Sequence, residues 1–352
     1  DEDSDDRKMQ RSAGRGGLMR AVICKDFKGA DALEIDDAVT PEPADDEVLV
    51  DVRAASVSFM DKLMAEGGYQ LRPDLPYSPG TEVAGLVVSV GAEVTRFKTG
   101  DRIAGQLWYG GYAERAVVKH WKCALIPPEV DYATASTVLH NYLTAYSALI
   151  DRCALKAGEA LFVTGATGGV GLAAVDMGRM LGARVIAGVG DMAKGPAARE
   201  AGASDVVDYR NGDLRAQIKD LTAGRGVDVC FEMIGGETFL AMARLMAWGG
   251  RLSPIGFVGG DIPALPMNLP LLKGYSVVGV FSGAWVEQFP AEAAAAADEV
   301  MNWIAAGKLT PRIDRVLPLE QAAEAMQLLA RREVLGRIVL ETAPGAGAQT
   351  GG

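Results

Sequence analysis

The feature that most constrains the fold is the glycine-rich segment TGATGGVGLAA at residues 164–174. It follows the apolar run ALFVT and opens a helical pattern. A glycine-rich turn between a strand and a helix lets backbone N–H groups approach a phosphate, and the helix dipole favours negative charge there. Aligned with G-x-G-x-x-G, the three positions are Ala166, Gly168 and Gly171, so alanine replaces the first glycine. The segment predicts a dinucleotide-binding turn, and a purely structural turn is the alternative.

The surrounding sequence alternates between strand-like and helix-like patterns. Six apolar runs predict strands at 160–164, 184–189, 205–209, 227–234, 250–257 and 275–281. Helical spacing separates them at 169–182, 192–202, 213–223 and 237–247. Alternation of this kind is typical of a parallel sheet with right-handed crossovers. Residues 137–283 are therefore expected to form a Rossmann domain, an α/β fold with a doubly wound parallel sheet.

The first third of the chain has a different pattern. Runs rich in β-branched residues, broken by Gly, Pro and Asp, predict strands at 18–24, 47–58, 82–91 and 112–118. They are too irregular for a parallel sheet and predict a distorted antiparallel barrel.

The C-terminal part has two helical patterns, 290–306 and 319–332, and one strand, 336–341. These are too few for a domain of their own. We therefore expect a discontinuous catalytic domain of residues 18–136 and 284–341. The polar segment 1–17 is expected to be a disordered extension, and 342–352 a flexible tail.

Composition excludes several classes of protein. The net charge of −11 argues against a nucleic-acid-binding surface and against binding to anionic membranes. No apolar run is long enough to span a bilayer. The four cysteines are far apart in sequence, which fits a reducing cytoplasm better than a disulfide framework.

Selection between NAD and NADP depends on the end of the second predicted strand. An acid there would accept hydrogen bonds from the ribose 2′-OH and repel a 2′-phosphate. Val189 ends that strand and Gly190 follows it, so both positions are neutral. Lys194, and Tyr209 at the end of the third strand, can bind a phosphate. The pattern favours NADPH; Asp191 as a ribose ligand is the alternative.

Several stretches together resemble a known family. They are LPYSPGTEVAGLVVSVG (75–91), FKTGDRIAG (97–105), GGYAERAVV (110–118), LTAYSALIDRCALKAGEALFVTGATGGVGLAA (143–174), GGRLSPIGF (249–257) and LGRIVLE (335–341). The sequence resembles the zinc-independent quinone oxidoreductase (zeta-crystallin-like) branch of the medium-chain dehydrogenase/reductase superfamily. The resemblance implies a GroES-like β-barrel catalytic domain, a Rossmann NADP-binding domain, a cleft between them and a homodimer.

The resemblance also implies that no metal is bound. Ser58 stands where zinc-dependent relatives carry a catalytic cysteine, and Thr81 stands where they carry a histidine. The two histidines, His120 and His140, and four dispersed cysteines offer no evident tetrahedral site.

The expected catalytic residues are hydrogen-bond donors for a developing oxyanion: Tyr69, which matches the family's pocket tyrosine, Ser58 and Thr144. Loop packing for Tyr69 and helix capping for Thr144 are the alternatives. The expected cofactor-binding residues are Ala166, Thr167, Gly168, Gly169, Val170, Gly171, Gly190, Lys194, Tyr209, Gly256 and Phe281.

These expectations define a function. The chain is expected to reduce quinones or related α,β-unsaturated carbonyls by hydride transfer from NADPH, without a metal. One alternative is an alkenal or enoyl double-bond reductase with the same cofactor. The other is a non-enzymatic NADPH-binding protein similar to the crystallins.

Overall fold

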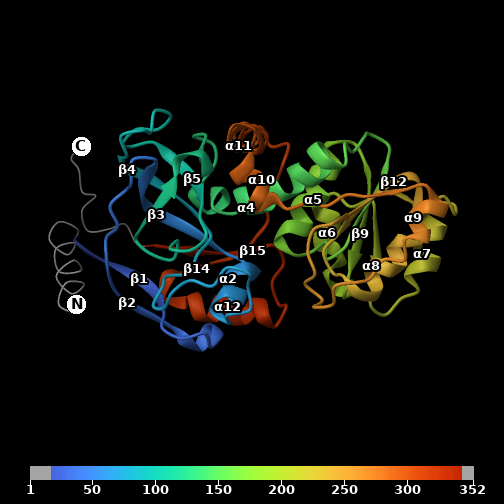
Figure 1. Ribbon diagram of the computed structural model, residues 1–352, viewed down its shortest axis with the longest axis horizontal. Helices are drawn as coiled ribbons and strands as arrows, with labels where there is room; N and C mark the ends of the chain where they lie inside the picture. The colour runs from blue at the N-terminus through green and yellow to red at the C-terminus, as the bar shows by residue number, and fades with distance from the viewer. Residues whose placement is uncertain (1–16, 343–352) are drawn as a thin grey trace. The chain divides into compact units, whose positions relative to one another are not determined.

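The computed structural model describes residues 17–342 (Figure 1). The expected extension and tail lie outside these residues, except for Gly17 and Thr342. The chain divides into two compact units. Unit 1 runs up to Leu139 and resumes at Ile313, and unit 2 is His140–Arg312. Within residues 17–342, no helix combines the length and apolarity needed to cross a membrane.

Unit 2 is built on a six-stranded parallel sheet. Its strands are β8 (Ala160–Val163), β9 (Arg184–Val189), β10 (Asp205–Asp208), β11 (Val227–Glu232), β12 (Met246–Pro254) and β13 (Ser276–Val277). Their spatial order is β10-β9-β8-β11-β12-β13. Counted within the unit this is 3-2-1-4-5-6, the Rossmann order. The predicted doubly wound sheet is confirmed.

Helices surround this sheet and bury its faces (Figure 1). They are α5 (Gly169–Met180), α6 (Gly195–Glu200), α7 (Leu214–Leu221), α8 (Gly236–Ala243) and α9 (Asn268–Lys273), with a 3₁₀ turn, η4 (Met192–Lys194). Phe162 and Ile186 from the strands pack against Ile218, Phe239 and Met242 from the helices. Strands covered on both faces are apolar throughout, which is why their pattern is visible in the sequence.

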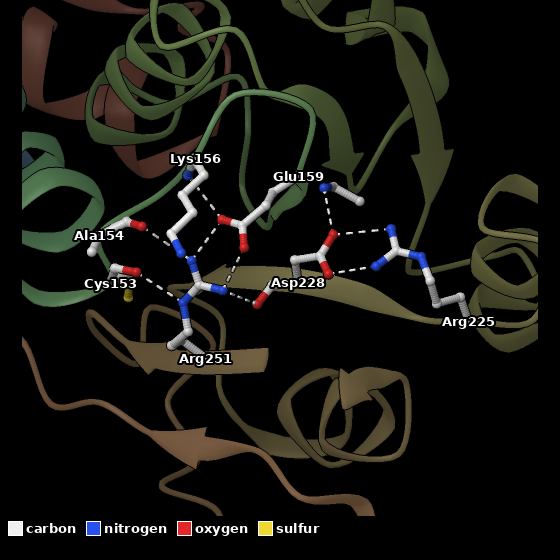
Figure 2. Close-up of polar contacts among 8 residues, drawn as sticks. Cys153, Ala154, Lys156, Glu159, Arg225, Asp228 and Arg251 are labelled. Carbon is white, nitrogen blue, oxygen red and sulfur yellow. Dashed lines mark hydrogen bonds and ion pairs between the residues drawn. The ribbon is translucent and has the colours of Figure 1, made fainter. Parts of the chain in front are cut away.

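An ionic network joins the beginnings of β8 and β11 to the middle of β12 (Figure 2). Arg251 of β12 binds both carboxylate oxygens of Glu159, at 2.9 and 2.7 Å, and donates through Nε to the Cys153 carbonyl at 2.8 Å. Asp228 of β11 accepts from the Ala160 N–H at 2.8 Å and pairs with the guanidinium of Arg225. The network ties the amino ends of β8 and β11 to Arg251 of β12, whereas the glycine-rich turn follows the carboxyl end of β8.

Unit 1 contains a seven-stranded sheet and a two-stranded hairpin. The sheet strands are β3 (Glu47–Val57), β4 (Glu82–Val90), β5 (Arg102–Gln106), β6 (Arg115–Lys119), β7 (Cys123–Leu125), β14 (Ile313–Pro318) and β15 (Arg337–Glu341); the hairpin is β1 (Leu18–Cys24) and β2 (Leu33–Val39). All pairs are antiparallel except β14–β15. The short helices are η1 (Gly29–Ala32), α2 (Phe59–Ala65), η2 (His120–Lys122), α3 (Tyr132–Ala135), η5 (Leu319–Gln321) and α12 (Ala322–Ala330).

The segment 284–312 differs from expectation, because it lies in unit 2 and not with unit 1. It carries most of α10 (Ser282–Gln288) and all of α11 (Pro290–Ala305). Trp285 and Trp303 each stack with the ring of Tyr146, at centroid distances of 6.4 and 6.1 Å. Tyr146 ends α4 (Leu139–Tyr146), which continues into the π-helix η3 (Ser147–Arg152). The returning chain therefore begins at Ile313, 29 residues beyond the expected boundary at 284.

Candidate cofactor and acceptor site

The glycine-rich turn joins β8 to α5 at the carboxyl edge of the parallel sheet. Gly168 is the N-cap of α5 and has no side chain to accept from the first helical N–H groups. These donors are left for an anion, and the helix dipole favours one there. The turn thus has the local structure that a pyrophosphate requires.

The glycines of the turn serve different purposes. A Cβ built on Gly171 would lie 2.9 Å from Ala166 Cα and closer still to the carbonyl oxygen of Gly165. Gly171 is therefore required by the close approach of the helix to the turn. A Cβ on Gly168 would meet only the Gly165 oxygen, at 3.6 Å, an ordinary contact. Gly165 has φ +59°, a conformation in which glycine avoids the strain of a Cβ.

A buried carboxylate next to this turn was missed by sequence reasoning. Glu232, at the end of β11, is fully buried and accepts from the N–H groups of Ile234 and Gly235 at 2.9 and 3.0 Å. Its Oε1 also accepts from Thr164 Oγ1 at 3.2 Å. Burial raises the pKa of Glu232, opposed by these hydrogen bonds. The residue joins the turn to the loop after β11; an acid ending a buried apolar strand was the available signal.

Four of the polar residues discussed for cofactor selection lie near the end of β9. Asp191 is the N-cap of η4, and its Oδ1 accepts from the Ala193 N–H at 2.9 Å. The Tyr209 hydroxyl lies 3.1 Å from the position of a Cβ on Gly190. Lys194 ends η4. The guanidinium of Arg210, which sequence reasoning did not include, also approaches Gly190, with Cζ at 3.6 Å from the built Cβ.

In unit 1, the structure brings together the two residues expected at the ligand positions of zinc-dependent relatives. Ser58 Oγ lies 3.2 Å from Thr81 Oγ1, and both side chains are buried. Ser58 is the N-cap of α2 in a capping box with Asp61. Its hydroxyl donates to Asp61 Oδ2 at 2.6 Å, so its proton is already engaged. This pair forms a compact hydrogen-bonded group in place of a thiolate and an imidazole.

Asp61 is the centre of this group. It is fully buried, and its Oδ2 also accepts from the Tyr112 hydroxyl at 3.0 Å. Burial raises the pKa of Asp61, while bonds from Ser58 and Tyr112 and the charge of Arg337 oppose the rise. Among residues 17–342, no three His, Cys, Asp or Glu side chains are grouped to hold a metal ion.

The remaining expected donors differ in availability. Thr144 Oγ1 donates to the His140 carbonyl one helical turn earlier, at 2.7 Å. Tyr69 is half-buried in the loop after α2, and burial raises the pKa of its hydroxyl above 10. Its hydroxyl makes no hydrogen bond to another residue of the described chain. Of the three expected donors, Tyr69 is the one with its proton available.

The last two expected cofactor residues follow strands of unit 2. Gly256 comes after β12, and a Cβ there would have no neighbour within 4 Å. Phe281 is exposed and lines an open cavity of about 690 Å³. The same cavity is lined by Tyr146, Ile150 and Trp285.

Comparisons with known proteins agree with this architecture. Residues 44–128 match the alcohol dehydrogenase GroES-like domain, and residues 169–299 match the zinc-binding dehydrogenase family. Quinone oxidoreductase-like protein 2 of Bos taurus is 34% identical over 329 residues, covering 93% of each chain. Human quinone oxidoreductase is 34% identical over 312 residues, covering 88% of this chain and 93% of its own.

A solved structure shares the whole fold. Escherichia coli quinone oxidoreductase complexed with NADPH has a TM-score of 0.83 and 28% identity, covering 92% of this chain and 98% of its own. The GroES-like and Rossmann components expected from the sequence are thereby confirmed. The chain belongs to the zinc-independent quinone oxidoreductase branch of the medium-chain dehydrogenase/reductase superfamily.

Proposed function

We propose that this protein binds NADPH through residues 164–171 and reduces quinones or related α,β-unsaturated carbonyls without a metal. The observation that carries the proposal is the Rossmann strand order with a glycine-capped helix at its first strand. The quinone oxidoreductase relatives and the NADPH complex of the E. coli protein support it.

The residues present fit the cofactor. The turn at Gly168 leaves room above the first N–H groups of α5, where a pyrophosphate binds in this fold. The neutral Gly190 beside Lys194 and Tyr209 suits a 2′-phosphate, because Asp191 is occupied in capping η4. When bound, NADPH supplies a hydride from the nicotinamide C4.

The acceptor needs a hydrogen-bond donor from the protein. Addition of hydride to a quinone or an enone places negative charge on a carbonyl oxygen, and a preorganised donor stabilises that charge. The Ser58 hydroxyl already donates to Asp61, and the Thr144 hydroxyl already donates to the His140 carbonyl. Tyr69 therefore serves as the principal donor, and its raised pKa keeps the hydroxyl protonated at neutral pH.

We also propose that the protein is a cytoplasmic homodimer. The sheet of unit 2 ends at β13, which pairs with β12 on one side only. Leu271, Leu272 and Val277 are exposed near this edge, as expected of a surface that a second copy covers. All four cysteines lie in the described chain as buried thiols, which fits a reducing compartment. Light scattering of the purified protein tests the dimer, and a monomer would contradict it.

The proposed activity is tested by following NADPH oxidation with a quinone and with an enal, side by side. Turnover of either acceptor, unaffected by a chelator, is the expected result. Rapid quinone turnover with slow enal turnover would identify a quinone reductase, and the reverse would identify a double-bond reductase. NADPH binding without oxidation by either acceptor would contradict the proposed enzyme activity.

A further inference from the structure

We propose that Arg210 is a specificity-determining residue that binds the 2′-phosphate of NADPH, and that Gly190 keeps the space for that contact open. This inference rests on the proposed function and adds a residue to its cofactor site. Its support is the geometry where β9 and β10 end side by side.

The register of the sheet places Arg210 beside Gly190. Asp208, the last residue of β10, pairs with Val189, the last residue of β9. The next residues of the two strands therefore leave the sheet at the same edge. Tyr209 and Arg210 lie opposite Gly190, at the place where the second strand of a Rossmann domain meets the adenosine ribose.

Gly190 leaves a space that these two side chains border. A Cβ there would lie 3.1 Å from the Tyr209 hydroxyl and 3.6 Å from Arg210 Cζ. The backbone of Gly190 does not have a positive φ, so conformation does not demand glycine at this position. Glycine is therefore needed here because a larger side chain would fill the space beside Tyr209 and Arg210.

The turn after β10 fixes the backbone of Arg210 without engaging its guanidinium. Asp208 Oδ1 accepts from the N–H groups of Arg210 and Asn211, both at 2.8 Å, and Oδ2 accepts from the Asn211 amide at 3.3 Å. These bonds and the nearby Arg210 charge lower the pKa of Asp208. Within the described chain, the Arg210 guanidinium forms no hydrogen bond or ion pair.

The charges around Gly190, where β9 and β10 end, favour a phosphate over a hydroxyl. Lys194 and Arg210 are the cations, and the carboxylates of Asp191 and Asp208 both accept from backbone N–H groups. A guanidinium can bind a phosphate through two parallel hydrogen bonds, whereas it has no acceptor for a ribose 2′-OH. Arg210 thus discriminates NADPH from NADH, with Lys194 adding a point charge.

The test uses two nucleotides that report on the phosphate alone, 2′,5′-ADP and 5′-AMP, titrated calorimetrically into the full-length protein. Arg210→Met should weaken 2′,5′-ADP binding by tenfold or more and change 5′-AMP binding less than twofold. Arg210→Lys should lie between Arg210→Met and wild type, because it keeps the charge and loses the paired donors. Arg215→Met is the matched control, since Arg215 is an exposed arginine on the following helix.

The outcomes separate this inference from the proposed function. Unchanged 2′,5′-ADP affinity in Arg210→Met, equal loss for both nucleotides, or the same loss in Arg215→Met overturns the role of Arg210. If the wild-type protein itself shows no preference for 2′,5′-ADP, the proposed NADPH specificity fails. Melting temperatures establish that each variant is folded, and Arg210→Lys carries the test if Arg210→Met is not.

Discussion

Alanine at each of the two glycines of the turn should separate folding from cofactor binding. In Gly171→Ala, the added methyl would overlap most with the carbonyl oxygen of Gly165 and would lie 2.9 Å from Ala166 Cα and from the Gly165 carbonyl carbon, about 0.5 Å inside ordinary contact. Both neighbours are backbone atoms, so α5 or the turn itself has to move. Overpacking of this kind costs roughly 1–3 kcal/mol. At roughly 2–4 °C per kcal/mol for a unit of this size, the melting temperature should fall measurably.

Gly168→Ala provides the contrast. The new methyl would meet only the Gly165 oxygen at 3.6 Å, and the residue has φ −81°, which alanine adopts freely. Stability should therefore match the wild type. The methyl would stand where the pyrophosphate approaches the N–H groups of α5, so the Kd for NADPH should rise by tenfold or more.

Differential scanning fluorimetry and fluorescence titration with NADPH measure the two effects. Gly171→Ala should lose both stability and affinity, and Gly171→Val, with a branched side chain, should not bind NADPH at all. Gly168→Ala should lose affinity alone. A Gly171→Ala protein with wild-type melting temperature and affinity would refute the close approach of helix and turn. Normal affinity in Gly168→Ala would show that the cofactor does not cross this turn.

Three further predictions concern other parts of the molecule. Tyr69→Phe should lower kcat/KM by about tenfold or more, most for an enone, with an unchanged Kd for NADPH; wild-type kinetics with both acceptors would mean that the ring only packs. Elemental analysis should find less than stoichiometric zinc. If a chelator abolished the activity and zinc restored it, the proposal that the enzyme works without a metal would be contradicted. Glu159→Gln should destabilise the protein by roughly 1–3 kcal/mol at pH 7, because the hydrogen bond from Arg251 holds the pKa of Glu159 below 4.5. Since a depressed pKa stabilises the fold above the unfolded value, the difference in melting temperature between wild type and Glu159→Gln should shrink as the pH falls below about 4.5; a constant difference would refute it.

The parallel sheet could be predicted because its strands are buried on both faces. The strand expected at 184–189 is β9, residue for residue, and the strand expected at 160–164 differs from β8 only in its last residue. The helix starting at 169 was marked by the same glycines that bring it close to β8. In these segments the need to bury the element and the local sequence pattern specify the same secondary structure at the same residues.

Other strands could not be predicted, because distant pairing and not local pattern forms them. β2, LEIDDAV, is largely exposed and carries three acids, yet it pairs along its whole length with β1. β14, IDRVLP, likewise contains no buried residue, and it pairs with β15. In β2 the alternation of apolar and polar residues stops after the first four, L-E-I-D, and β14 shows none. The helical pattern at 290–306, which is α11, indicated a buried face but not the unit against which that face packs, and α10 was not expected.

In the candidate site, too, the sequence predicted which residues are present but not the hydrogen bonds that their side chains make. Sequence placed Ser58 and Thr81 at the ligand positions of zinc-dependent relatives, and the structure puts their hydroxyls 3.2 Å apart. Sequence could not show that Ser58 gives its proton to Asp61, because that depends on the capping geometry of α2. Sequence likewise could not show that Asp191 caps η4, where its Oδ1 accepts from the N–H of Ala193.

The hydrogen bonds that the hydroxyl groups make within the protein decide which of them can donate to the acceptor. A hydroxyl has one proton, so each one held by a carboxylate or a carbonyl is withdrawn from the acceptor. Ser58 and Thr144 are both held in this way, which leaves Tyr69 among the expected donors. A neutral phenol stabilises an oxyanion less than a metal ion does, so the acceptor's own ease of reduction has to contribute more of the driving force. At the glycine-rich turn, by contrast, the backbone N–H groups of α5 are the expected donors to the pyrophosphate, and no side-chain proton is needed there. Selectivity in this enzyme should therefore be greater for the nucleotide than for the acceptor.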